Sequence, residues 1–479
     1  MPFIFGGLMN QEERNFINDE NLDEALSRFK RSLVSGRKKY FDVSEFEGIV
    51  EYLLDEGDIN ASEIAARQGI QIHPGAVPLQ LKYAQVLLSK GKYENALNYL
   101  DLAEQLEAAN PDVHLMKGSA WLILGDDRNA EKSFRRALKA GATEEDDILY
   151  HIGAAYIQAG EVEKAVSYFE RALDKNPANE QALYDLGFFS DQLGNFDKSI
   201  EYYNRYLDSN PFNYSTWFNL GITYNKAGNY KKAIEAYEFS LALNDTFSQA
   251  LFNIANAHAN ASNFNEAIER YNEFLEIDPD NDDAWCYIGE CYLNLEDYFQ
   301  SEFFYQKAIK LNPENDTAWF GIGLIMWVEK KYGESIVFIN KALKLDNDNS
   351  EYWLTLARVY NDYNKLEKAT DALKTAARLE PGNAEIWLTW VDVLLKFGET
   401  KNALRILKTG LKKNSDVLLK YRLVSLLLEN KEEDRALAVL DDAMDQEFVQ
   451  VNYLFDIYPK ALKNKRLKKQ VDNYRKKYM

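Results

Sequence analysis

Apolar residues in the middle of the chain recur with the spacing of an amphipathic helix. One stripe, at steps i, i+3, i+4 and i+7, consists of Trp217, Leu220, Gly221 and Tyr224. Gly228 and Asn229 then interrupt the pattern, as expected for a helix that ends in a left-handed turn. A second stripe follows and consists of Tyr230, Ala233, Ile234, Tyr237 and Leu241. The pattern predicts two short helices joined by a tight turn.

The same helical pair returns about every 34 residues. One phase of the repeat is marked by small residues, which are Ala96, Ala130, Ala165, Ser199, Ala233, Ala267, Ser301, Ser335, Ala369, Ala403 and Ala436. Their spacing is 34 residues except for one gap of 35 and one of 33. A second small series runs through Gly118, Gly153, Gly187, Gly221, Gly289 and Gly323. Small residues allow helix backbones to approach, and a pair that cannot bury its own stripe must stack on its neighbours.

This pattern resembles the tetratricopeptide repeat, whose signature is W-x2-L-G-x2-Y, then A-x3-F, then a proline. The first stripe around Trp217 matches the first part, and Ala233 matches the second with Tyr237 in place of Phe. Asp245 replaces the closing proline in this copy. The resemblance implies an all-α fold, a right-handed superhelical solenoid of stacked helix–turn–helix units.

The repeat also predicts how the chain is divided. About twelve units fit residues 43–449, with degraded copies at both ends, as expected where terminal units cap a stack. Residues 1–42 remain as an N-terminal segment with a short helix at 22–35. Residues 450–479 form a basic C-terminal helix or cap.

The net charge of the 479-residue chain is −20, which argues against a nucleic-acid groove along its main body. The acidity either keeps a long surface soluble or selects a basic partner. The last twenty residues reverse this balance, because they hold nine Lys or Arg and one Asp. The basic positions considered for binding are Lys463, Lys465, Arg466, Lys468, Lys469, Arg475, Lys476 and Lys477.

We expect a soluble, cytoplasmic protein without a disulfide framework. The two cysteines, Cys286 and Cys291, are five residues apart on one expected helix and poorly placed to bridge. The apolar start of the chain lacks a basic n-region, and no apolar run approaches the roughly 20 residues that span a bilayer.

The sequence contains no motif that indicates enzyme chemistry, a cofactor or a metal site. The four histidines, His73, His114, His151 and His258, have no Cys, His or carboxylate at ligand spacing. Phosphate-binding glycine loops and nucleophile motifs are absent from the sequence as well. We therefore expect a protein that is not an enzyme and takes no small-molecule substrate.

In tetratricopeptide proteins the first helix of each unit lines the concave groove that holds partners. With the tryptophan counted as position 4, positions 2, 5, 6, 9, 12 and 13 point away from the buried stripe. The candidate groove residues at these positions are Tyr150, Tyr184, Phe188, Phe218, Asn219, Asn225, Phe252, Asn253, Asn256, Phe320 and Trp327. Aromatic rings would supply contact area, and asparagines would hydrogen-bond a peptide backbone.

Alternatives remain open for each group. The position-5 aromatics are also suited to packing against the adjacent unit, and Phe188 and Trp327 depart furthest from the repeat pattern. The asparagines are also common in turns. Position 5 lacks the Lys and Asn with which co-chaperone members of the family grip a carboxylate, so that mode of binding is not expected.

These features predict a non-catalytic scaffold or adaptor that holds a protein or peptide in the concave groove, and a basic one if the acidity selects the partner. The alternative is an assembly factor docked through its basic C-terminal helix to a ribosome, nucleic acid or an anionic membrane. That basic tail could also be a solubilising end cap, or fold onto the acidic body of the same or another molecule.

Overall fold

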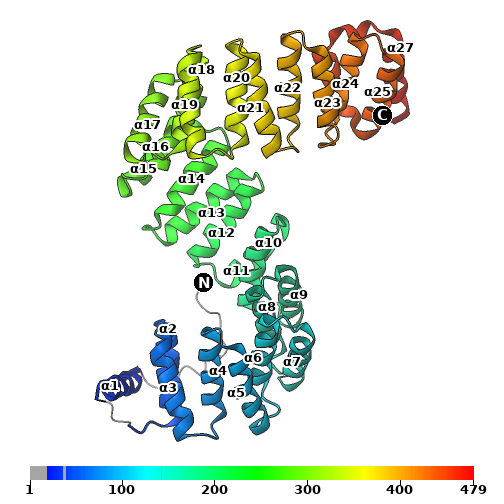
Figure 1. Ribbon diagram of the computed structural model, residues 1–479. Coiled ribbons are helices and arrows are strands. Elements are labelled where there is room, and N and C mark those ends of the chain that lie inside the picture. The colour runs from blue at the N-terminus through cyan, green and yellow to red at the C-terminus, as the bar shows by residue number, and fades with distance from the viewer. Residues whose placement is uncertain (1–18, 36–38, 142, 479) are drawn as a thin grey trace. The chain divides into compact units, whose positions relative to one another are not determined.

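The computed structural model of the protein describes residues 19–35, 39–141 and 143–478, and within these ranges the chain forms helices and no strand (Figure 1). The chain divides into two compact units, which meet between Ala250 and Leu251. Each unit consists of short helices joined by tight turns.

The helices of the first unit are α1 Asp19–Ser35, α2 Val43–Asp55, α3 Ile59–Ile72, α4 Val77–Ser89, α5 Tyr93–Leu106, α6 Pro111–Ile123, α7 Asp127–Ala140, α8 Glu145–Gln158, α9 Val162–Lys175, α10 Glu180–Gln192, α11 Phe196–Ser209, α12 Tyr214–Lys226 and α13 Tyr230–Leu243. Helix α14, Ser248–Asn260, contains the boundary between the units. The helices of the second unit are α15 Phe264–Ile277, α16 Asp282–Asn294, α17 Tyr298–Leu311, α18 Asp316–Val328, α19 Tyr332–Leu345, α20 Ser350–Asp362, α21 Leu366–Leu379, α22 Ala384–Lys396, α23 Thr400–Gly410, α24 Val417–Glu429, α25 Glu433–Glu447, η3 Phe448–Gln450, α26 Val451–Ile457, η4 Pro459–Lys463 and α27 Lys465–Tyr478.

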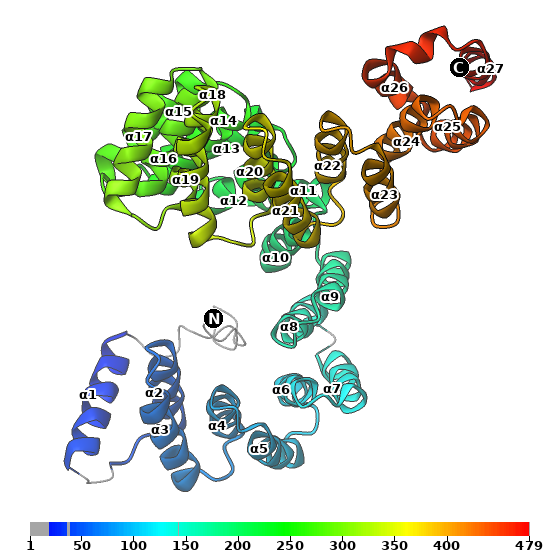
Figure 2. The ribbon, with the colours of Figure 1, turned by 45° about the horizontal axis from the view of Figure 1, so that its top comes forward.

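Within each unit the helices pack in consecutive pairs, and each pair packs on the next. In the first unit α4 packs on α5, α6 on α7 and α8 on α9, and α5 also contacts α6 (Figure 2). In the second unit α16 packs on α17 and α18 on α19 in the same way. The prediction of an all-α solenoid of stacked helix–turn–helix units is therefore confirmed.

Local sequence fixes where the helices begin and end. An asparagine side chain accepts a backbone N–H at the start of many first helices, at Asn110, Asn179, Asn213, Asn281, Asn315, Asn349 and Asn383. Between the two helices of a pair the chain takes a positive φ, which is 75° at Gly228. Five pairs make the same turn without glycine, at Ser262, Glu296, Lys330, Asn364 and Lys431.

The recurring tryptophan ties each first helix to the loop before it. The indole of Trp217 donates from Nε1 to the carbonyl of Pro211, six residues earlier, at 2.8 Å. Equivalent bonds are made by Trp285, Trp319, Trp353 and Trp387. His114 occupies the same position in α6, and its Nε2 lies 2.9 Å from the carbonyl of Ala108. This histidine therefore has a structural role, which its position relative to the tryptophans could have indicated.

In six of the helix pairs a glycine of the first helix makes room for a bulky side chain of the second helix. A Cβ added to Gly221 would come within 2.5 Å of Cε1 of Tyr237, which is fully buried. The same arrangement joins Gly118 to Phe134, Gly153 to Phe169, Gly187 to Tyr203 and Gly289 to Tyr305, with Ile339 taking the place of the ring beside Gly323. The small-residue series therefore marks the helix crossings.

Substituting this glycine should open the helix crossing. Gly221→Ala should lower the free energy of local unfolding of α12 and α13 by about 1–3 kcal/mol, because the new methyl group collides with the fully buried ring of Tyr237. Gly333→Ala in α19 is the matched control, since nothing lies within 4 Å of its added Cβ. It should leave stability unchanged or raise it slightly. Native-state hydrogen exchange measures both, and equal losses for the two variants would contradict the packing argument.

Candidate partner-binding surface

In the first unit the outward positions of the expected groove lie on α8, α10 and α12. The rings at position 5 are half-buried, because each leans on a ring from the second helix of its own pair. The ring centroids are 5.3 Å apart for Tyr150 and Phe169, 6.1 Å for Tyr184 and Tyr203, and 5.5 Å for Phe218 and Tyr237. These aromatic residues therefore contribute to packing between helices, and only part of each ring faces outward.

Polar groups on this face bind one another across neighbouring pairs. The hydroxyl of Tyr150 on α8 donates to Asp185 Oδ2 on α10 at 3.0 Å. The amide of Asn219 on α12 donates to the hydroxyl of Tyr184 at 3.0 Å. Each bond joins residues 35 apart in sequence, so it links one repeat to the next. Asn225 on the same helix is half-buried.

The second unit uses the same 35-residue interval. Trp327 donates from Nε1 to Asp362 Oδ2 at 2.9 Å, and Lys396 donates to the carbonyl of Asn361 at 2.7 Å. Phe320 is only 7 % exposed and stacks on Tyr352 with centroids 4.4 Å apart. Cys286 and Leu354, which hold the same place in their repeats, are buried too. These three position-5 side chains therefore offer little surface to a partner.

The expected asparagine ladder of α14 is occupied internally. Asn256 Oδ1 accepts the hydroxyl of Tyr271 at 2.5 Å, and its amide donates to Asn253 Oδ1 at 3.4 Å. The ring of Phe252 packs against Phe274, with centroids 5.1 Å apart. These three predicted site residues stand on one helix, but they mainly hold their own unit together.

Phe188 differs from the other predicted aromatics of this surface in its exposure. Its side chain is 41 % exposed, and its ring makes an edge contact with Phe189 at 5.1 Å. One turn before it on α10 is Asp185, and three residues after it is Asp191. Sequence reasoning missed both carboxylates, although they stand at positions 6 and 12 of the same outward face.

The two carboxylates are poorly satisfied within the protein. Asp191 is 8 % exposed, and its Oδ2 accepts from Lys226 Nζ at 2.5 Å, whereas its buried Oδ1 accepts no hydrogen bond. An unsatisfied buried acceptor costs roughly 1–3 kcal/mol. Burial raises the pKa of Asp185 to about 6, although the hydrogen bond from Tyr150 acts in the opposite direction.

The buried His151, Cys286 and Cys291 side chains supply neither an imidazolium nor a thiolate at pH 7. Burial lowers the pKa of His151, next to Tyr150 on α8, to about 4, so this imidazole is neutral at pH 7. The free cysteines Cys286 and Cys291 are both buried, and burial followed by the charge of Glu290 raises the pKa of Cys291 to about 12. Among the described residues, no group of three His, Cys, Asp or Glu side chains is arranged to hold a metal ion.

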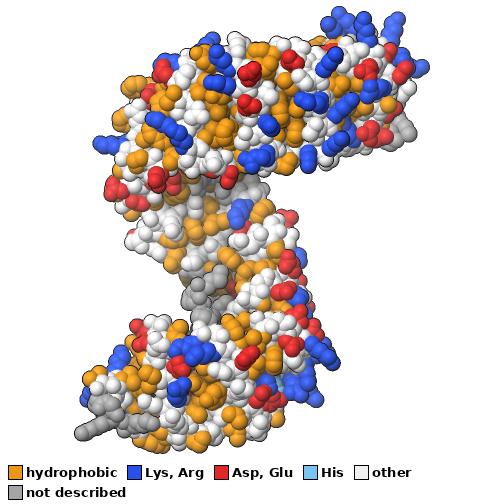
Figure 3. Space-filling model, viewed as in Figure 1, with side chains coloured by type: hydrophobic (Ala, Val, Ile, Leu, Met, Phe, Trp, Pro, Cys, Tyr) orange, Lys and Arg blue, Asp and Glu red, His pale blue; other side chains and the backbone are white. Residues whose placement is uncertain are grey.

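The basic end of the chain is a packed helix with one exposed face. Leu467 and Val471 of α27 are buried against the apolar cluster that includes Leu454. Arg466 pairs with Asp434 at 2.8 Å and Glu433 at 3.5 Å. Between residues 460 and 476 the exposed cations that form no ion pair with a described residue are Lys460, Lys463, Lys465, Lys468, Lys469, Arg475 and Lys476. The side chain of Lys477 lies outside the described residues, and in Figure 3 basic side chains gather at this end of the second unit.

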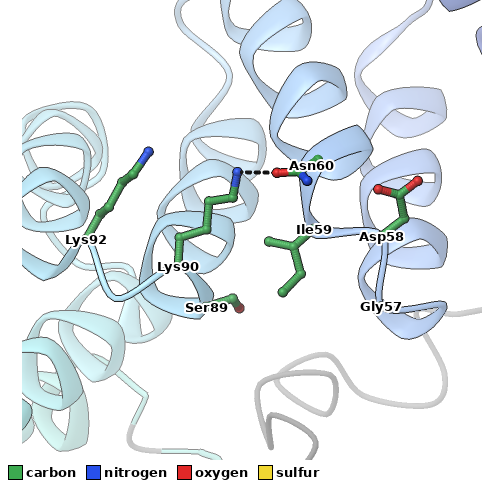
Figure 4. Close-up of a pocket in the computed structure, with 7 residues that line it drawn as sticks. All are labelled: Gly57, Asp58, Ile59, Asn60, Ser89, Lys90 and Lys92. Carbon is green, nitrogen blue, oxygen red and sulfur yellow. Dashed lines mark hydrogen bonds between the residues drawn. The ribbon is translucent and has the colours of Figure 1, made fainter.

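An open pocket lies between the start of α3 and the end of α4 (Figure 4). Lys90 and Asn60 face each other across it, joined by a 2.8 Å hydrogen bond, and Lys90 also pairs with Glu63. Both lysines of the pocket, Lys90 and Lys92, pair with Glu63, so their charges already have a partner within the protein.

The repeat geometry defines a class of protein. A tetratricopeptide repeat model matches residues 81–146 and 150–214. Proteins built from this repeat are typically non-enzymatic scaffolds that bind protein partners. Within the described residues, none of the helices has the length and apolar character needed to cross a membrane.

A second model identifies the family more closely. Residues 210–452, just over half of the chain, match the family described as the C-terminal domain of cilia and flagella-associated protein 70, and the chain belongs to this family. The human protein of that name is 28 % identical over 100 residues, which cover 20 % of this chain and 9 % of the human protein.

Solved repeat proteins resemble the chain at low sequence identity. Yeast Tom70 is 14 % identical, with a TM-score of 0.44 over 86 % of this chain and 94 % of Tom70. The APC/C hetero-tetramer Cut9–Hcn1 is 14 % identical, with a TM-score of 0.38 over 77 % of this chain and 94 % of the matched chain.

The raised pKa of Asp185 predicts a pH-dependent stability. Its folded pKa of about 6 lies above the unfolded value, so the stabilisation from the protonated form is lost as the pH rises from about 4 through 6. Asp185→Asn should remove this pH dependence. At pH 7 the free energy of unfolding of the variant should exceed that of the wild type by about 1–2 kcal/mol, a value that allows for the partial exposure of the side chain.

Urea unfolding of both proteins between pH 4 and pH 7 measures the difference. Asp197→Asn, at an exposed carboxylate on α11, is the control and should follow the wild type at every pH. If the free energies of unfolding of Asp185→Asn and the wild type changed in parallel with pH, the buried charge of Asp185 would not destabilise the fold, and the prediction would be wrong.

Proposed function

We propose that this chain is a non-catalytic scaffold or adaptor that binds a protein segment along the outward face of α8, α10 and α12. The observation that carries the proposal is the exposed ring of Phe188 on a face whose other rings are half-buried by packing. An exposed aromatic residue held by a rigid surround is the usual anchor of a protein interface. The other predicted residues of these three helices, Tyr150, Tyr184, Phe218, Asn219 and Asn225, lie on the same outward positions.

A rigid surface favours binding because it loses little freedom when a partner docks. The bonds from Tyr150 to Asp185 and from Asn219 to Tyr184 fix these side chains before any partner arrives. Less conformational entropy is then lost on association. The net charge of −20 favours a basic partner by the same electrostatic logic.

The binding face is tested by placing a photocrosslinking phenylalanine derivative at position 188. The partner should be captured from this position and not from position 299, since Phe299 on α17 is 81 % exposed but lies on a second helix. Phe188→Ala should then weaken binding of the captured partner roughly ten- to thirtyfold, as expected for an interface anchor. Phe299→Ala should leave that affinity unchanged, and equal losses would remove the assignment of the face.

A second candidate function is favoured by the exposed cations of α27, which would dock an assembly factor to a ribosome, nucleic acid or an anionic membrane. Lys465, Lys469 and Lys476 share one face of the helix, opposite the buried Leu467 and Val471. A cation near an anionic lipid surface contributes about 1 kcal/mol.

Substitution tests this candidate better than removal, because deleting α27 would uncover the apolar cluster beneath it. If α27 docks to phosphate, the variant Lys465→Gln/Lys469→Gln/Lys476→Gln should lose binding to anionic vesicles or RNA, and wild-type binding should fall steeply with salt. Lys401→Gln/Lys408→Gln/Lys412→Gln, at exposed lysines of α23 and the turn after it, is the control. Wild-type binding that is absent or insensitive to salt would eliminate this function.

A further inference from the structure

We propose that the Asp185, Phe188 and Asp191 face of α10 is a subsite for an arginine side chain of the bound protein segment. This face is called the α10 subsite below. The inference rests on the proposed function, since it names the chemistry recognised on the surface assigned there.

The geometry of α10 places an exposed ring between two carboxylates. Phe188 follows Asp185 by three residues and precedes Asp191 by three, so the three side chains form one continuous strip along the helix. The ring is 41 % exposed, whereas Asp185 is half-buried and Asp191 is buried. A partner group that covers the ring therefore lies on the helix face from which both acids project.

Asp191 carries the strongest indication of a missing donor. Its side chain is more than nine-tenths buried, and Oδ1 has no hydrogen-bond partner within the protein. Oδ2 is bound to Lys226, whose own side chain is 43 % exposed and shares its charge with water. The protein therefore leaves one buried carboxylate oxygen without a donor, beneath the surface beside Phe188.

Asp185 also retains acceptor capacity. Its one hydrogen bond comes from the Tyr150 hydroxyl at 3.0 Å, whereas a carboxylate has about four acceptor sites. Both acids act on the same neighbour, the buried hydroxyl of Tyr203. Its pKa is raised first by burial and then by the charges of Tyr184, Asp191 and Asp185. The two carboxylates are thus close enough to affect one buried group. Among the described residues, Lys226 is the one cation that forms an ion pair with either of them.

Arginine fits this arrangement better than lysine. A guanidinium is planar, stacks on an aromatic ring, and carries five donors in a fixed fork that reach acceptors on either side. An ammonium is a compact, strongly hydrated charge that gains less from an exposed ring. Two carboxylates beside a ring also lack the third oxygen ligand expected of a divalent-cation site.

The test uses saturation-transfer NMR with the full chain at pH 7 and constant ionic strength. The probe is the peptide acetyl-Gly-Arg-Gly-Gly-amide, compared with its citrulline and lysine counterparts. The wild type should bind the arginine peptide roughly fivefold or more tightly than either counterpart. Equal affinity for the lysine peptide would overturn the proposal, because the site would then recognise positive charge alone. Equal affinity for the citrulline peptide would also overturn it, because the site would then not recognise charge at all.

Matched variants separate the subsite from the general acidity of the chain. Asp185→Asn/Asp191→Asn should abolish the preference for arginine, while Asp197→Asn/Asp208→Asn should retain it, since both control acids are exposed on α11 of the same repeat. Loss of the preference in both variants would show non-specific attraction and overturn the proposal. Melting curves confirm that each variant is folded.

The two assignments fail in different ways. Capture of a partner from position 188 without any arginine preference would leave the binding face intact and reject the α10 subsite. An arginine preference that depends on Asp185 and Asp191, without capture of any protein from position 188, would support the subsite and reject the proposal that this face holds a protein segment.

Discussion

The structure depends on the close approach of two helices, which six of the repeats achieve with a glycine in the first helix. At Gly221 the backbone of the first helix presses against the ring of Tyr237, and the same contact recurs along both units. A methyl group in this place would fall inside the ring's van der Waals surface. Because the contact fixes the separation of the two helices, it also fixes how each pair presents its remaining faces to the next.

This fixed arrangement of neighbouring helix pairs explains why polar contacts recur at a fixed interval along the sequence. Tyr150 reaches Asp185, and Trp327 reaches Asp362, across the same 35 residues in different units. Residues that a helical wheel assigns to an outward face are therefore side by side with their counterparts in the neighbouring repeat. Much of the hydrogen-bonding capacity of the face is used between repeats, which makes the surface stiff and leaves few groups for a partner.

Phe188, Asp185 and Asp191 are exceptions to this use of polar groups between repeats. Asp191 keeps a buried oxygen without a donor, and Asp185 is held in a setting that disfavours its charge. Both features cost stability in the isolated chain, and costs of this kind are typical of places shaped for function. At the other end of the chain, α27 combines a buried apolar side with exposed cations, so that one helix serves as a cap and as a charged surface.

The sequence by itself determined the helical pairs, their period and the family resemblance. The reason is that the stripe around Trp217, the turn glycine and the small crossing residues act locally or at a constant spacing. It also singled out Phe188 as a departure from the repeat. Only the tertiary structure decided which outward residues remain available. Phe320 is covered by Tyr352, and Asn219 is held by Tyr184, through partners supplied by adjacent repeats. A helical period gives the direction of a side chain, whereas burial and unsatisfied acceptors such as Asp191 Oδ1 depend on what the neighbouring repeat places opposite it.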